Sequence, residues 1–220
     1  MSPPPLAVLF DLDGTLLDTA PDFARVLNRM LAEHELPALP YHRIRATVSH
    51  GARALVQLAF GISDGEPGFD PLRARLLALY EAGLREETVP FEGIRVLLDT
   101  LAARGIAWGV VTNKPHYLAA PLMAGMGFEP PAAVLVCPDH VSRTKPDPEP
   151  LLLACRQIGC DPAKAIYVGD HARDIEAGRR AGMVTVAAAW GYLAEDESVL
   201  AWGADHVVQD VAGLQSLLFT

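Results

Sequence analysis

Short apolar runs of strand length stand near the start of the chain and recur from about residue 106 onwards. Turn-forming residues follow these runs, and segments with helical spacing of apolar residues separate the later ones. This alternation predicts an α/β fold, a doubly wound parallel sheet with helices on both faces. The expected strands are 6–10, 106–111, 134–136, 165–168 and 184–188, with a weaker one at 206–208. The expected helices are 94–104, 117–126, 150–158, 174–181 and 211–218.

The stretch between about residues 18 and 88 breaks this alternation. It shows helical patterns at 23–33, 52–60 and 72–84 and no convincing strand, so we expect a helical insertion after the first strand. The predicted domains are an α/β catalytic core of residues 1–17 and 90–220 and an inserted α-helical cap of residues 18–89. Asp18, followed by Pro21, is the expected N-cap of the first cap helix.

Composition narrows the classes of partner. With 50% hydrophobic residues the chain can bury a core, and its net charge of -9 argues against general affinity for nucleic acid or anionic membranes. No run approaches the roughly 20 apolar residues of a membrane span, and the first residues do not resemble a secretory signal. The three cysteines form no CxxC pair, which favours reduced thiols. We therefore expect a cytoplasmic protein with a small-molecule partner, either monomeric or a homodimer.

Polar residues follow the predicted strands at the points where those strands end. Asp11 and Asp13 share a face if the first strand continues, and like charges that close need a cation or a proton between them. Ligands bind beyond the carboxyl ends of strands in open parallel sheets. The other groups expected at this edge are Thr112, Asn113, Lys145, Asp170 and Asp174.

This set of groups suits phosphoryl transfer. Phosphoryl oxygens need hydroxyl, amide and ammonium contacts, whereas a nucleophile and a metal need carboxylates. Oxygen ligands without a Cys/His cluster favour Mg²⁺ over zinc. The sequence thus predicts a magnesium-dependent phosphoryl-transfer site.

Four segments resemble, in order, the motifs of the haloacid dehalogenase-like (HAD) phosphatases. They are FDLDGTLLDT, VVTNKP, the lysine in RTKPDPEP, and VGDHARD. The resemblance covers essentially the whole chain, because the helical insertion stands where that family has its cap. It implies a Rossmann-like core and a cap that closes over the substrate.

The resemblance also implies roles for the motif residues. Asp11 matches the nucleophile that forms an aspartyl-phosphate, and Asp13 matches the general acid/base. Thr112 and the N–H of Asn113 would hold the phosphoryl oxygens, while Lys145 would offset their charge. The implied Mg²⁺ positions are Asp11, the backbone carbonyl of Asp13, Asp170 and Asp174, the last in direct contact with the metal or supporting a ligand.

In the cap segment 42–53, Ser49-His50-Gly51 interrupts two helical patterns, and arginines flank this interruption. These arginines are either solvated helix charges or part of a loop that faces the substrate. An arginine suits a carboxylate because its planar fork can donate two hydrogen bonds. The candidate substrate contacts are Arg45, Ser49, His50, Gly51 and Arg53, with Arg43 as a further arginine that could turn inward.

The resemblance implies a Mg²⁺-dependent phosphatase of a small phosphomonoester. Within the family the chain looks like the phosphoglycolate phosphatase branch. The runs WGVVTNKP and CPDHVSRTKPDPEPLLLAC are similar to the bacterial N-acetylmuramic acid 6-phosphate phosphatases. Both substrates bear a carboxylate remote from the phosphate. The alternatives are a sugar phosphomutase on the same scaffold and a non-enzymatic phospho-accepting receiver, although receivers are shorter and lack such an insertion.

Overall fold

The computed structural model describes residues 5–194 and 197–219. Among these residues, six strands form one sheet in the order β5-β4-β1-β6-β7-β8, and all neighbouring pairs are parallel. This confirms the predicted fold class. The strands are β1 (Ala7–Phe10), β4 (Ala107–Val111), β5 (Leu135–Val136), β6 (Ala165–Gly169), β7 (Val184–Ala188) and β8 (His206–Val208).

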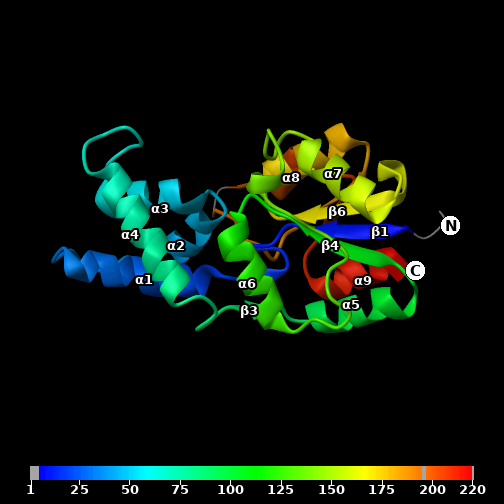
Figure 1. Cartoon of the computed structure of the whole chain (residues 1–220), viewed down its shortest axis with the longest axis horizontal. Helices are drawn as coiled ribbons and strands as arrows, with labels where there is room; N and C mark the ends of the chain where they lie inside the picture. The colour runs from blue at the N-terminus through cyan, green and yellow to red at the C-terminus, as the bar shows by residue number, and fades with distance from the viewer. Residues whose placement is uncertain (1–4, 195–196, 220) are drawn as a thin grey trace.

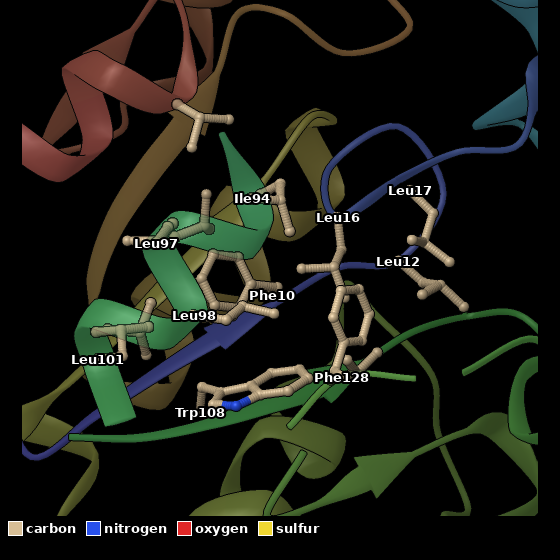
Figure 2. Close-up of a cluster of buried hydrophobic side chains, with 14 of the residues drawn as sticks. Phe10, Leu12, Leu16, Leu17, Ile94, Leu97, Leu98, Leu101, Trp108 and Phe128 are labelled. Atoms are coloured by element: carbon tan, nitrogen blue, oxygen red, sulfur yellow. The ribbon is translucent and has the colours of Figure 1, made fainter. Parts of the chain in front are cut away.

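Helices cover both faces of this sheet (Figure 1). On one face α5 (Ile94–Ala103), α6 (His116–Met126) and α9 (Val211–Phe219) pack on Phe10 and its neighbours, as Figure 2 shows for part of the cluster. On the other face α7 (Glu149–Ile158) and α8 (Ala172–Ala181) pack on Leu9 and its neighbours. All four residues of β1 are buried, as expected for a parallel strand between two helical layers.

The predicted insertion is a group of helices at one end of the sheet (Figure 1). It consists of α1 (Ala20–Glu33), α2 (Tyr41–Val48), α3 (Gly51–Phe60) and α4 (Phe69–Ala82), which share their own apolar cluster. The chain enters and leaves it through β2 (Leu17–Asp18) and β3 (Val89–Pro90), which pair antiparallel. We call α1–α4 the cap; the division into domains at residues 18 and 89 stays a prediction.

Short 3-10 helices at Pro138–His140, Pro162–Lys164 and Val199–Trp202 complete the regular elements of residues 5–194 and 197–219. No helix in the described part of the chain combines the length and the apolar character needed to cross a membrane.

The predicted N-cap at Asp18 is wrong. Thr19 occupies the N-cap position of α1, and its side chain makes no capping hydrogen bond. Tyr192 follows β7, and its hydroxyl accepts hydrogen bonds from the N–H groups of Thr19 (2.6 Å) and Ala20 (2.9 Å). The same hydroxyl donates to Asp18 Oδ1 at 2.8 Å. A side chain distant in sequence therefore satisfies the helix end that a local residue was expected to cap.

Asp22 ties α1 to the chain that leaves the cap. Its carboxylate is fully buried and accepts hydrogen bonds from the N–H (3.0 Å) and hydroxyl (2.6 Å) of Thr88. Arg25 Nη2 donates to the same carboxylate at 2.8 Å. Two segments that are distant in sequence are thus joined beside the β2–β3 ribbon.

We predict that Asp22→Ala lowers the free energy of unfolding by roughly 2–3 kcal/mol, because it leaves the buried N–H and hydroxyl of Thr88 without an acceptor. Urea unfolding measures this loss. Asp99→Ala, at an exposed position on α5, is the control and should change stability by less than about 0.5 kcal/mol. Equal effects of the two substitutions would contradict the prediction.

Candidate active site

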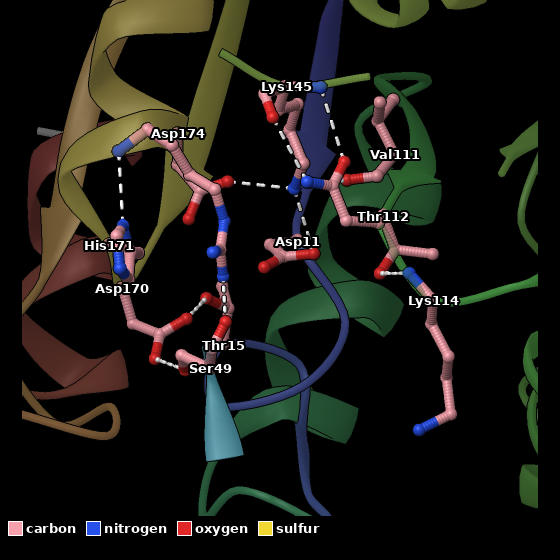
Figure 3. Close-up of polar contacts among 12 residues, drawn as sticks. Asp11, Thr15, Ser49, Val111, Thr112, Lys114, Lys145, Asp170, His171 and Asp174 are labelled. Atoms are coloured by element: carbon pink, nitrogen blue, oxygen red, sulfur yellow. Dashed lines mark hydrogen bonds and ion pairs between the residues drawn. The ribbon is translucent and has the colours of Figure 1, made fainter. Parts of the chain in front are cut away.

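The predicted motif residues meet at the carboxyl ends of β1, β4 and β6, which are neighbours in the sheet. Asp11 follows β1, Thr112 follows β4 and Asp170 follows β6, so the parallel register brings them to one edge (Figure 3). Lys145 reaches the same point from the segment before α7. The expected convergence of these groups is therefore a feature of the structure.

Asp11, Asp170 and Asp174 form a buried carboxylate cluster. They offer oxygen atoms that all lie within 4.8 Å of one another. Asp174 Oδ2 is buried and has no hydrogen-bond partner among the described residues. Three carboxylates with a spare buried oxygen fit a divalent cation that prefers oxygen ligands.

Hydroxyl and amide donors fix the Asp170 carboxylate at both oxygens. Thr15 Oγ1 donates to Oδ1 at 2.9 Å. Ser49 Oγ, from the cap, and the N–H of Tyr192 each donate to Oδ2 at 3.0 Å. Gly14 lies so close that a Cβ there would stand 2.2 Å from Asp170 Oδ2, and its φ of +85° also favours glycine.

Burial and mutual repulsion separate the pKa values of the three carboxyls. Burial, then the charges of Asp11 and Asp174, raises the pKa of Asp170 to about 7. Burial likewise raises the pKa of Asp174 above its usual value. Burial would also raise the pKa of Asp11, but the charges of Lys145 and Arg173 hold it below its ordinary value. Of the three carboxyls, Asp11 is thus the one whose ionised form the surroundings favour.

Lys145 is fully buried and bridges two of these carboxylates. Its Nζ lies 3.0 Å from Asp11 Oδ1 and 2.7 Å from Asp174 Oδ1. It also donates to the Val111 carbonyl at 3.0 Å and the Tyr167 hydroxyl at 2.8 Å. With its partners on several sides, the ammonium group holds the carboxylates together despite their repulsion.

The side chain of Asn113 holds the segment that carries Lys145. Its Nδ2 donates to the Lys145 carbonyl at 3.1 Å, and its Oδ1 accepts the Lys145 N–H at 3.2 Å. The adjacent Thr112 hydroxyl accepts the N–H of Lys114 at 3.1 Å. Consecutive residues after β4 thus position both the hydroxyl and the lysine.

A cavity of about 280 Å³ lies between the core and the cap. Its wall includes most of the predicted site residues, whereas Lys145, Asp170 and Asp174 do not line it. The predicted residues on the wall are Asp11, Asp13, Thr112, Asn113, Ser49, His50, Gly51 and Arg53.

Arg45, an expected substrate contact, is directed away from this cavity. Its guanidinium donates to the carbonyls of Gly191 (2.8 Å) and Trp190 (2.9 Å). It also lies 4.9 Å from the centroid of the Tyr192 ring. Arg43 is exposed on the same helix. Arg45 therefore fastens α2 to the core, a role that sequence alone did not suggest.

Sequence reasoning assigned no role to three cations on the cavity wall, Lys114, Arg73 and Arg173. Lys114 Nζ lies 2.9 Å from Asp13 Oδ1. Arg173 Nη2 donates to the carbonyl of Ser49 across the cap–core boundary. Lys114 and Arg173 stand within recognised motifs, which is a signal that could have found them. Arg73, on α4, has no such signal.

Comparison with known proteins gives a consistent result. Residues 8–188 match the family described as haloacid dehalogenase-like hydrolase. A Pseudomonas aeruginosa protein named N-acetylmuramic acid 6-phosphate phosphatase is 50% identical over 202 residues, 92% of this chain and 89% of that protein. A Xanthomonas campestris protein named phosphoglycolate phosphatase is 44% identical over 205 residues, 93% and 92% of the two chains.

A solved structure shares the same architecture. The crystal structure of a predicted phosphoglycolate phosphatase from Haemophilus somnus superposes with a TM-score of 0.86 at 25% identity, covering 99% of each chain.

The raised pKa of Asp170 predicts that binding of a divalent cation at this cluster would depend on pH. Between the ordinary carboxyl value of 3.8 and about 7, the folded cation-free protein retains a proton that the unfolded chain has lost. The stabilisation from this group is therefore present at low pH and is lost as the pH rises through about 7. Because a ligand must be ionised, cation affinity should increase over the same interval.

We predict that Mg²⁺ binding at about pH 6 releases a proton and that the affinity is at least several-fold higher at about pH 8. Calorimetric titration in two buffers of different ionisation enthalpy measures both quantities. Asp170→Asn should remove the proton release. Equal affinity at both pH values, with no proton released, would show that Asp170 is not protonated in the cation-free protein.

Proposed function

This chain belongs to the haloacid dehalogenase-like hydrolase family, and we propose that it is a phosphatase that hydrolyses a small carboxylate-bearing phosphomonoester through an aspartyl-phosphate. The observation that carries this proposal is the separation of the paired aspartates. Both line the cavity, but Asp11 also belongs to the buried carboxylate cluster beside Lys145, whereas Asp13 is not part of that cluster. Two carboxylates two residues apart thus have environments suited to different tasks.

In the first step an oxygen of Asp11 bonds to phosphorus and the bond from phosphorus to the ester oxygen breaks. Asp13 donates its proton to the leaving oxygen, so that an alcohol departs. In the second step Asp13 takes a proton from water, whose oxygen bonds to phosphorus as the bond to Asp11 breaks. Inorganic phosphate leaves and both aspartates regain their initial states.

The remaining core residues bind the phosphoryl group. Thr112 and Asn113 line the cavity, where the Thr112 hydroxyl and the N–H of Asn113 would donate to the phosphoryl oxygens. Lys145, behind Asp11, compensates the negative charge that accumulates there. The nucleophile and its counter-charge are therefore in place before a substrate arrives.

HAD phosphatases generally use Mg²⁺, and the donor set of this site fits that ion. Asp11, Asp170 and Asp174 would hold it, and the family resemblance adds the backbone carbonyl of Asp13. When bound, Mg²⁺ offsets the charge of the carboxylates and of the phosphoryl oxygens. Oxygen ligands alone favour Mg²⁺ over softer metals.

The substrate class follows from the relatives and from the cap. The relatives are named for N-acetylmuramic acid 6-phosphate and phosphoglycolate, and each compound has a carboxylate remote from its phosphate. Arg53 and Arg73 supply cationic side chains to the cavity from the cap side. Arg53 is exposed and paired with Asp64 at 2.7 Å. Arg73 Nε is buried without a partner among the described residues, so we assign the carboxylate to Arg73.

The division of labour between the aspartates can be tested directly. Asp11→Asn should abolish formation of a trapped phosphoenzyme. Asp13→Asn should reduce turnover of alkyl phosphates by roughly 10²–10⁴-fold, and of p-nitrophenyl phosphate much less, because that leaving group needs little protonation. Quench-flow trapping and steady-state rates measure these effects, with Asp99→Asn as a surface control. Equal losses on both esters would refute the acid role.

The role of Arg73 is tested with a pair of substrates that differ only in the lactyl ether that carries the acid. Arg73→Ala should lower kcat/KM for N-acetylmuramic acid 6-phosphate by roughly 10–100-fold, the loss of a hydrogen bond to a charged group. N-acetylglucosamine 6-phosphate, which lacks the lactyl acid, should be little affected. Arg75→Ala, two residues along α4 and paired with Glu33 at 2.8 Å, is the matched control. A similar loss on both sugars would exclude carboxylate recognition by Arg73.

A further inference from the structure

Lys114 is a buried cation that the mechanism above does not use. It follows Thr112 and Asn113 after β4, and its side chain is only 4% exposed. Figure 3 shows this side chain directed away from Asp11 and Lys145. Burying an ammonium group costs several kcal/mol unless it is paired, so its partners determine where it lies.

Two aromatic rings of the cap hold this ammonium group. Phe23 on α1 and Tyr80 on α4 stack with their centroids 4.0 Å apart and their planes 5° apart. Lys114 Nζ lies 5.0 Å from the Phe23 centroid and 4.5 Å from the Tyr80 centroid. It also donates to the Tyr80 hydroxyl at 3.0 Å. A core lysine is thus fixed by two cap helices through cation–π and hydrogen-bond contacts.

The third contact of Lys114 is Asp13, and it involves one oxygen only. Lys114 Nζ donates to Asp13 Oδ1 at 2.9 Å, and Thr19 Oγ1 donates to the same atom at 2.6 Å. Within the described part of the chain, every hydrogen bond to this carboxylate ends on Oδ1. The other oxygen, Oδ2, therefore remains for exchange of a proton with a substrate in the cavity that Asp13 lines.

We propose that Lys114 is a positioning residue that anchors Asp13 Oδ1 and so presents Oδ2 to the leaving oxygen and then to water. The inference rests on the proposed role of Asp13 as general acid/base. Because Phe23 and Tyr80 hold Lys114, Asp13 is aligned for proton transfer when α1 and α4 occupy the positions that they have in this structure. The paired aspartates then have separate lysines: Lys145 compensates the charge of Asp11, and Lys114 orients Asp13.

The test uses phosphate esters with increasingly poor leaving groups, from p-nitrophenyl through phenyl to alkyl. Lys114→Met keeps an unbranched side chain that is one atom shorter, and removes its charge. It should reduce turnover of alkyl phosphates by roughly 10–100-fold and of p-nitrophenyl phosphate by less than about 3-fold, because it acts through the proton transfer. Tyr80→Phe retains the ring and removes the hydroxyl, and should produce a smaller change of the same kind.

A double-mutant cycle separates positioning from direct contact with the substrate. Once Asp13→Asn has removed the acid/base, adding Lys114→Met should cost little more with phenyl phosphate, since both changes affect one function. Phosphoenzyme formation should persist in Lys114→Met. Lys164→Met, on the surface of the α/β core domain, is the matched control.

Equal losses on all esters in Lys114→Met and Tyr80→Phe, or fully additive losses in the cycle, would overturn the assignment of Lys114. If Asp13→Asn itself shows no dependence on the leaving group, the proposed role of Asp13 fails instead. The two failures are thereby distinguished.

Discussion

The close approach of buried carboxylates after β1 and β6 is the constraint on which the rest of the site depends. Asp11, Asp170 and Asp174 place oxygen atoms within 4.8 Å of one another, where like charges repel strongly out of water. Lys145 counters this repulsion from one side, and the hydroxyls of Thr15 and Ser49 from another. The sheet, covered on both faces, supplies the rigidity that holds such groups together.

Several of the polar contacts that join the cap to the core converge on one short loop, residues 190–192. Arg45 on α2 donates hydrogen bonds to the carbonyls of Trp190 and Gly191. The Tyr192 hydroxyl accepts the N–H groups of Thr19 and Ala20 at the start of α1. The same loop donates the N–H of Tyr192 to Asp170. A displacement of the cap therefore acts on the neighbours of the carboxylate cluster, although the apolar clusters of cap and core are largely separate.

The strands and the motif residues could be predicted from sequence because their signals are local. A strand buried on both faces is a continuous apolar run, as in β1, and the polar residues follow it directly. Helix α2 gave only a weak signal, since only Ile44 and Val48 of it are buried. The direction of Arg45 and of Lys114 could not be predicted, because the groups that hold them lie on other elements, brought near only by the tertiary fold.

The ribbon of β2 and β3 brings the two ends of the helical insertion to paired positions, with Leu17 opposite Pro90 and Asp18 opposite Val89. Paired backbones lie about 5 Å apart, so the insertion begins and ends at neighbouring positions of the core, as a tight turn would. Its length adds little to the entropy of closing the core, since that cost grows only with the logarithm of loop length. A fold built this way can accept a cap of different size while the register of its sheet stays the same. Substrate specificity can therefore diversify without changes to the residues that carry out phosphoryl transfer.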